Sequence, residues 1–191
     1  MRLIVLASKS PYRKALLSRL PLDFITHDSN INEDLDLPSH QALVETLALE
    51  KAKAAQLVYP EALCIGSDTL GTLGDLRLGK SASEALAQEQ LQQMSGQIVD
   101  FYTGIALYDH QQNLSLQHTV VTSVKFRTLT PKMIQHYLDK EKPFQSCASF
   151  KSETSAIALI ESCTSEDPTA IVGLPLITLC SMLMKAGIEV F

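Results

Sequence analysis

The stretch Arg2-Leu3-Ile4-Val5-Leu6-Ala7-Ser8-Lys9-Ser10-Pro11-Tyr12-Arg13 decides the fold. Residues 2–7 form an apolar run of strand length, far shorter than the core and cleavage site of a signal peptide. Ser10-Pro11 then places a hydroxyl at a helix N-cap and a proline at the first helical position, where its missing N–H costs nothing. A buried strand that turns at once into a helix, here over 11–20, is typical of α/β proteins.

The remaining sequence alternates short strand-like runs with longer helix-like stretches, which predicts an α/β fold with a sheet flanked by helices. The 191 residues, 46% of them hydrophobic, are enough for a single domain over 1–191. Ser81-Ala82-Ser83-Glu84 fits a capping box. The expected strands lie near 2–7, 23–27, 62–67, 98–108, 117–127 and 156–161, and the expected helices over 11–20, 39–58, 82–94, 131–140 and 175–186.

Composition excludes several classes of protein. The net charge of −5 is opposite to the basic excess of nucleic-acid-binding domains, so no nucleic acid is expected as a partner. No apolar run approaches the roughly 20 residues of a membrane helix. The four cysteines show no CxxC pairing and the five histidines no HExxH spacing. We therefore expect a soluble, cytoplasmic protein with reduced cysteines.

The turn after the first strand is a candidate anion site. Backbone N–H groups at a helix start attract anions, and Arg13 in the first helical turn can grip a phosphate through two hydrogen bonds. The alternative is that Ser8 and Ser10 only cap a helix, because this turn lacks the glycines of a phosphate-binding loop.

A second candidate is Leu63-Cys64-Ile65-Gly66-Ser67-Asp68-Thr69. An apolar strand here delivers Asp68 at its C-terminal end, where ligands gather in open α/β sheets, and Gly66 permits close backbone approach. A carboxylate at this position can hold Mg²⁺ or accept a proton from an attacking water. Alternatively, Asp68 only caps the next turn.

Scattered charges complete the candidates. Cleavage of a phosphoanhydride needs cations near the phosphoryl oxygens and a carboxylate that orients water. The side chains of these types are Glu33, Lys51, Lys80, Lys151 and Glu153. Each lysine taken alone is more typical of a solvated surface charge. The turn at 171–176 is interpreted as structural packing.

Taken together, these segments resemble the Maf family of nucleotide pyrophosphatases along nearly the whole chain. The matching motifs are Leu6-Ala7-Ser8-x-Ser10-Pro11-x-Arg13, Glu50-Lys51-Ala52, Gly66-Ser67-Asp68, Leu78-Gly79-Lys80, Ser95-Gly96, Tyr102-Thr103-Gly104 and Gly173-Leu174-Pro175-Leu176. Within the family, the branch that acts on 7-methyl-GTP is the most similar. Its features are Ser10-Pro11-Tyr12-Arg13, Tyr59-Pro60, Phe126-Arg127, Cys147-Ala148, Ser149-Phe150-Lys151-Ser152-Glu153 and Ile171-Val172-Gly173-Leu174-Pro175-Leu176-Ile177.

The resemblance implies an elongated mixed sheet flanked by helices, with two lobes around a central cleft, similar to inosine-triphosphate pyrophosphatases. It also implies a house-cleaning hydrolase that splits 7-methyl-GTP into 7-methyl-GMP and pyrophosphate, with a divalent metal, Mg²⁺ or Mn²⁺. Members of the family are frequently homodimers. By matched position, Asp68 and Glu33 are the implied catalytic and metal-binding carboxylates. The implied phosphate-binding residues are Ser8, Arg13, Lys51 and Lys80.

Tyr12, Thr69 and Glu153 are the residues implied to line the base. A 7-methylated guanine is a cation, so Tyr12 can stack on it and Glu153 can pair with its edge or its charge. Thr69 stands where this branch tends to have glutamine, and it resembles the branch that acts on dTTP and UTP.

Other departures concern charge and glycine. Asn32 replaces an acid beside Glu33, Ser81 follows Lys80 where proline is usual, and the usual glycines around 147–156 are lost or replaced. Glycines near phosphates let the backbone come close. Two alternatives therefore stay open: a pyrophosphatase for dTTP, UTP or a modified pyrimidine, and a nucleotide-binding protein with weak turnover linked to cell division.

Overall fold

The computed structural model describes residues 2–191. The helices are α1 (Pro11–Leu17), α2 (His40–Val58), α3 (Glu84–Met94), α4 (Pro131–Glu141) and α5 (Leu176–Lys185), with 3-10 helices η1 (Ser155–Leu159) and η2 (Ala170–Val172). The strands are β1 (Ile4–Leu6), β2 (Phe24–Thr26), β3 (Leu63–Leu73), β4 (Leu76–Leu78), β5 (Ile98–Asp109), β6 (Leu114–Phe126) and β7 (Ile160–Ser165). The predicted helices are all present, and α1 is the one that ends clearly earlier than expected.

The strands form one mixed seven-stranded sheet in the order β2-β1-β3-β5-β6-β7, with β4 paired to β3. β1 is parallel to both β2 and β3, and its Leu6 is in register with Ile65. The β3–β4 and β6–β7 pairs are antiparallel. This sheet with its flanking helices confirms the predicted α/β class.

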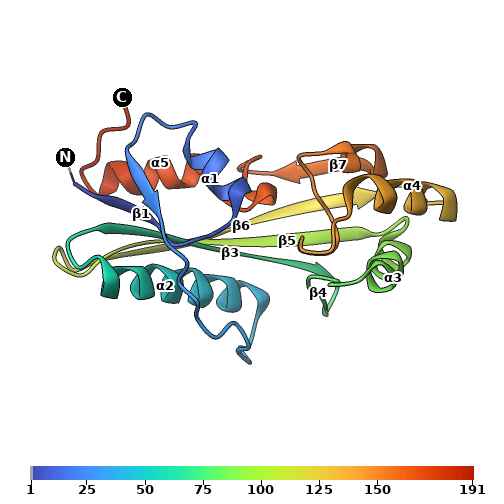
Figure 1. Ribbon diagram of the computed structural model, residues 1–191, viewed down its shortest axis with the longest axis horizontal. Helices are drawn as coiled ribbons and strands as arrows, with labels where there is room; N and C mark the ends of the chain where they lie inside the picture. Colours follow the sequence, from blue (N-terminus) through green and yellow to red (C-terminus); the bar gives the residue numbers. More distant parts are fainter. Residues whose placement is uncertain (1) are drawn as a thin grey trace. The chain divides into compact units, whose positions relative to one another are not determined.

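The chain divides into two compact units, and the first comprises Met1–Asp68, Thr103–Val120 and Asp167–Phe191. In this unit α2 covers one face of the sheet, while α1 and α5 cover the other (Figure 1). Strand alternation explains the layering, because successive side chains point to opposite faces. Ile4 and Leu6 join the core under α1 and α5, whereas Val5 and Ala7 join the core under α2.

Helix α2 lies directly on the backbone of the sheet. A Cβ added at Gly66 of β3 would overlap the carbonyl oxygen of Ala48, and one added at Gly104 of β5 would overlap the carbonyl oxygen of Val44. The side of the helix over Gly66 is alanine, with Ala48 and Ala52 fully buried. Small residues on both surfaces therefore set the distance between α2 and the sheet.

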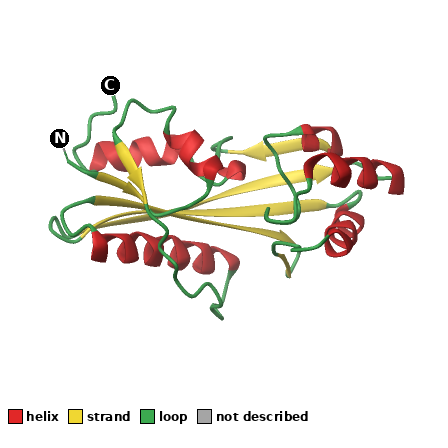
Figure 2. Cartoon of the chain, in the orientation of Figure 1, coloured by secondary structure: helices red, strands yellow, loops and turns green. Residues whose placement is uncertain are grey.

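The second unit comprises Thr69–Tyr102 and Val121–Glu166. Its helices α3 and α4 lie against each other (Figure 2). Its core includes Phe150, whose ring lies 5.8 Å from that of Phe101 and 5.2 Å from that of Phe126 between centroids. Ala148 and Ser149, just before Phe150, have left-handed φ values of 52° and 51°. These are unusual for residues with a Cβ.

Two sequence predictions about elements in the second unit were wrong. The strand expected at 156–161 is the 3-10 helix η1 followed by β7, because Glu141 accepts hydrogen bonds from the Ser155 amide and hydroxyl and holds this segment in a turn. Helix α3 is capped by Ser83, whose side chain accepts from the Leu86 N–H, and not by Ser81. Ala82, at φ 57°, is not helical.

The cysteines and the lengths of the helices are two further features of the fold. All four cysteines are thiols, and burial raises the pKa of Cys64 to about 11. Across residues 2–191, each helix is too short or too polar to cross a bilayer.

The contact at Gly66 predicts a stability effect. Gly66→Ala should lower the free energy of unfolding by about 1–3 kcal/mol, because α2 must move away from the sheet. The matched control is Gly79→Ala, where an added Cβ meets nothing within 4 Å and φ is not left-handed. The control should be neutral or slightly stabilising. Urea unfolding measures both, and equal stability of the two variants would contradict the packing account.

Candidate catalytic site

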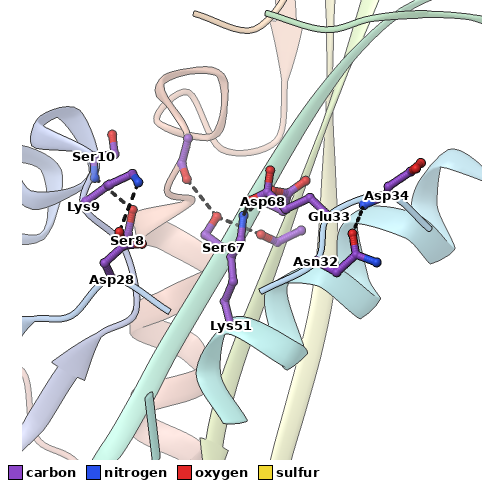
Figure 3. Close-up of polar contacts among 12 residues, drawn as sticks. Ser8, Lys9, Ser10, Asp28, Asn32, Glu33, Asp34, Lys51, Ser67 and Asp68 are labelled. Atoms are coloured by element: carbon purple, nitrogen blue, oxygen red, sulfur yellow. Dashed lines mark hydrogen bonds and ion pairs between the residues drawn. The ribbon is translucent and has the colours of Figure 1, made fainter. Parts of the chain in front are cut away.

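A lysine held between two carboxylates forms the centre of the candidate site. The Lys51 Nζ lies 2.6 Å from Asp68 Oδ1 and 2.6 Å from Glu33 Oε1. Figure 3 shows Lys51 pointing from α2 toward Asp68 and Glu33. The Lys51 side chain is only 8% exposed and that of Asp68 14%, whereas Glu33 is 55% exposed. A lysine this buried requires anionic partners, and these two carboxylates supply them.

The sequence predicted that Asp68 lies at the C-terminal end of its strand, and this prediction was wrong. β3 continues through it to Leu73, because β4 pairs back onto Gly71–Leu73. The parallel neighbour β1 nevertheless stops at Leu6, opposite Ile65. Asp68 therefore lies just beyond the parallel part of the sheet, which is the edge where ligands bind in α/β proteins.

Glu33 approaches from the acidic loop before α2. The neighbouring Asn32 is exposed, and its side-chain oxygen accepts a hydrogen bond from the Asp34 N–H at 3.0 Å. This local turn is common for asparagine and aspartate. Asn32 thus shapes the loop that carries Glu33.

The turn between β1 and α1 pairs Ser8 with Arg13. Ser8 is 7% exposed, and its Oγ accepts from the Ser10 N–H at 3.1 Å and from Arg13 Nη1 at 3.5 Å. Arg13 Nε donates to the Gly173 carbonyl oxygen at 2.8 Å. The guanidinium is therefore held in one orientation from two sides.

The sequence predicted that backbone N–H groups in this turn attract an anion, but several of these groups already donate to partners within the turn. The Ser8 N–H donates to Leu6 O, the Ser10 N–H to Ser8 Oγ, and the Arg13 N–H to Ser10 Oγ. The predicted N-cap role of Ser10 is confirmed. Helix α1 has only seven residues, and anion binding by the Ser8 and Arg13 side chains remains a prediction.

Ser67 and Gly173 were missed as structural links near this site. The buried Ser67 hydroxyl lies 2.8 Å from the carbonyl oxygens of both Gly104 and Gly173 and can donate to either. Gly173 has φ 112°, a conformation that strongly favours glycine. The same carbonyl oxygen thus contacts the arginine of the turn and the residue before Asp68. The 171–176 segment contacts Arg13 through the Gly173 carbonyl, a backbone contact that residue types do not reveal.

The other predicted residues have different surroundings. Tyr12 is 38% exposed on α1 in the first unit. Thr69, Lys80 and Glu153 belong to the second unit, where Lys80 is exposed and its backbone pairs with that of Cys147.

The segment that carries Glu153 is fixed on both sides. The Lys151 Nζ donates to the Glu141 carbonyl oxygen at 2.5 Å, and Thr154 Oγ1 donates to Lys151 O at 2.9 Å. A hydrogen bond from Ser155 lowers the pKa of Glu141 below its ordinary value. Lys151, one of the candidate cations in the sequence, therefore contacts the backbone at Glu141.

The cluster of Glu33, Lys51 and Asp68 combines the groups that phosphoryl chemistry needs. Carboxylates can orient water and an ammonium can neutralise phosphoryl oxygens. The carboxylates also fit Mg²⁺ or Mn²⁺, since Mg²⁺ is often bound by one or two carboxylates together with substrate phosphates and water. Within the described part of the chain, no three His, Cys, Asp or Glu side chains gather to hold a metal alone. Phosphate and water would have to complete the coordination.

The chain is an α/β protein with a carboxylate–lysine cluster just beyond its parallel strands. Comparison with known sequences shows the family to which it belongs. The Maf-like protein family matches residues 3–186. Proteins named 7-methyl-GTP pyrophosphatase are similar over almost the whole chain. The protein from Colwellia psychrerythraea is 40% identical over 100% of this chain and 96% of its own length. Those from Polaromonas sp. and Nitrosococcus oceani are 42% and 43% identical, over 100% and 98% of this chain and 87% and 94% of their own lengths. The chain belongs to the Maf-like protein family.

The two lysines of α2, Lys51 and Lys53, provide a matched test of the buried cluster. Lys51→Met should lower the free energy of unfolding by about 2–4 kcal/mol, because it leaves the largely buried Asp68 carboxylate without its cation. Lys53→Met removes only a half-exposed pair with Glu50 and should change stability by less than about 1 kcal/mol. Urea unfolding of both variants measures the difference, and equal effects would show that the Lys51 cluster is no more than a surface pair.

Proposed function

We propose that this chain hydrolyses 7-methyl-GTP to 7-methyl-GMP and pyrophosphate. The observation that carries the proposal is the pair of carboxylates that converge on the buried Lys51. In this reaction water attacks the α-phosphorus, the bond from that phosphorus to the α–β bridging oxygen breaks, and pyrophosphate leaves. The names and full-length similarity of the relatives support the nucleotide as substrate.

The roles of the cluster follow from its chemistry. Asp68 accepts the proton of the attacking water, and Glu33 orients that water and the cation. Lys51 keeps the two carboxylates close together and neutralises charge on the phosphoryl oxygens as the bond breaks. Glu33 and Asp68 would also hold Mg²⁺ or Mn²⁺, which would supply charge neutralisation when bound.

The phosphate and base roles come from the other residues. Ser8, Arg13 and Lys80 bind the triphosphate, with Arg13 pre-oriented by its bond to Gly173. Tyr12 stacks on the methylated base, and Glu153 pairs with its edge or charge. Thr69, which follows Asp68, contacts the base or sugar and contributes to selectivity.

The proposal extends to the setting of the protein. The chain acts as one domain over 1–191, forms a homodimer and works in the cytoplasm as a house-cleaning enzyme. The match of one family over 3–186 supports the single domain, and the four thiols suit a reducing compartment.

A panel of nucleotides tests the substrate and the reaction. With Mg²⁺ or Mn²⁺ present, 7-methyl-GTP should give the highest kcat/KM, with pyrophosphate as the released product, and EDTA should remove the activity.

The Tyr12→Ala variant should reduce the preference for 7-methyl-GTP over GTP by roughly tenfold, since GTP lacks the cationic ring. A higher kcat/KM for dTTP or UTP would favour the pyrimidine alternative. Tight binding by calorimetry without turnover would favour the nucleotide-binding alternative.

The carboxylate role has its own control in the same assay. Asp68→Asn keeps the shape of the side chain but removes the base, and it should lower kcat by about 10²–10⁴-fold. Asp75→Asn changes an exposed aspartate in the turn between β3 and β4 and should retain full activity. Full activity of Asp68→Asn would contradict the proposed mechanism.

A further inference from the structure

A buried carboxylate, Asp167, holds the turn that precedes α5. Asp167 is 1% exposed, and its Oδ1 accepts from the Thr169 N–H at 3.2 Å and lies 2.7 Å from the Thr169 hydroxyl. Its Oδ2 accepts from the Thr178 N–H at 3.1 Å. The N-cap residue of α5 is Pro175, which makes no side-chain cap. Asp167 therefore caps the first turn of a helix that begins nine residues later in the chain.

Thr169 fastens the two ends of the same turn. Its Oγ1 accepts from the Leu176 N–H at 2.8 Å and lies 2.9 Å from the Leu174 carbonyl oxygen. The hydroxyl donates its single hydrogen either to that oxygen or to Asp167. A third contact comes from β5, where Thr103 Oγ1 donates to Ala170 O at 2.9 Å. Side chains thus fix the segment between Ala170 and Leu176 at both ends.

The carbonyl group of Gly173 projects from this fixed turn to two residues of the candidate site. Its oxygen accepts from Arg13 Nε and lies 2.8 Å from Ser67 Oγ. An arginine that is already oriented loses less side-chain freedom when it binds a phosphate. Any displacement of the Gly173 carbonyl would therefore change the orientation of the guanidinium.

We propose that Asp167 and Thr169 are positioning residues, which set the phosphate-binding orientation of Arg13 through the Gly173 carbonyl. This inference rests on the proposed function, because it assigns Arg13 to the triphosphate. Neither residue contacts the substrate. Their effect should appear in substrate binding more than in the chemical step.

Thr169 offers a matched pair of variants. Thr169→Val keeps the shape of the side chain and removes its hydroxyl bonds, whereas Thr169→Ser keeps the hydroxyl. The valine variant should raise KM for 7-methyl-GTP about tenfold and weaken binding of inorganic pyrophosphate by a similar factor. Its kcat should change less than about twofold. The serine variant should keep the KM for 7-methyl-GTP and the affinity for pyrophosphate close to those of the unaltered protein.

A double-mutant cycle separates positioning from general loss of structure. In an Arg13→Ala background, Thr169→Val should cause no further rise in KM, because the group that it orients is gone. Asp167→Asn should raise KM in the same direction as Thr169→Val and show the same dependence on Arg13. Thermal unfolding of each variant, with assays well below its midpoint, keeps stability effects apart from KM.

The outcomes distinguish this inference from the function on which it rests. If the unaltered protein neither hydrolyses 7-methyl-GTP nor binds pyrophosphate, the proposed function fails, and the phosphate role of Arg13 fails with it. If the unaltered protein is active and Thr169→Val leaves KM unchanged, the positioning inference alone is wrong. It is also wrong if Thr169→Ser behaves like Thr169→Val, or if the effects of Arg13→Ala and Thr169→Val on KM multiply independently.

Discussion

The close packing of α2 on the backbone of β3 and β5 is the constraint on which the candidate site depends. Gly66 and Gly104 leave no room for a Cβ beneath the helix. At this distance the Lys51 side chain is almost buried and its ammonium reaches Asp68. Two neighbouring carboxylates repel each other, and the ammonium between them offsets that repulsion. Backbone sterics therefore lead directly to the charge cluster that we assign to water activation.

A second constraint acts on the other side of β3. The Gly173 carbonyl accepts from Arg13 and lies within hydrogen-bond distance of Ser67, which directly precedes Asp68 in the strand. One short segment of β3 is thus contacted by α2 at Gly66 and by the turn before α5 at Ser67. The two glycines act differently, because Gly66 provides space whereas Gly173 provides a left-handed backbone. Gly66 allows α2 to bring Lys51 to Asp68, the proposed catalytic carboxylate. The Gly173 carbonyl contacts Arg13, the proposed phosphate-binding residue.

Local signals in the sequence predicted local structure well. Ser10 caps α1 as expected, because an N-cap depends on a hydroxyl and the next three residues. The strand predicted over 62–67 continues to Leu73 because it pairs with β4, a contact that apolar periodicity does not encode. The site residues were found by type and by family resemblance, and the pairing of Lys51 with Glu33 and Asp68 needed the fold. Asp167 and the Gly173 carbonyl gave no signal, since one caps a helix from a distance and the other is backbone.

The central claim is that the cluster of Glu33, Lys51 and Asp68 directs water to the α-phosphorus of a nucleoside triphosphate. Hydrolysis of 7-methyl-GTP in ¹⁸O-labelled water, followed by mass spectrometry of both products, tests this claim most directly. The account predicts one labelled oxygen in 7-methyl-GMP and none in the pyrophosphate. Label in the pyrophosphate, or release of labelled orthophosphate as the first product, would place the attack at another phosphorus and contradict the account.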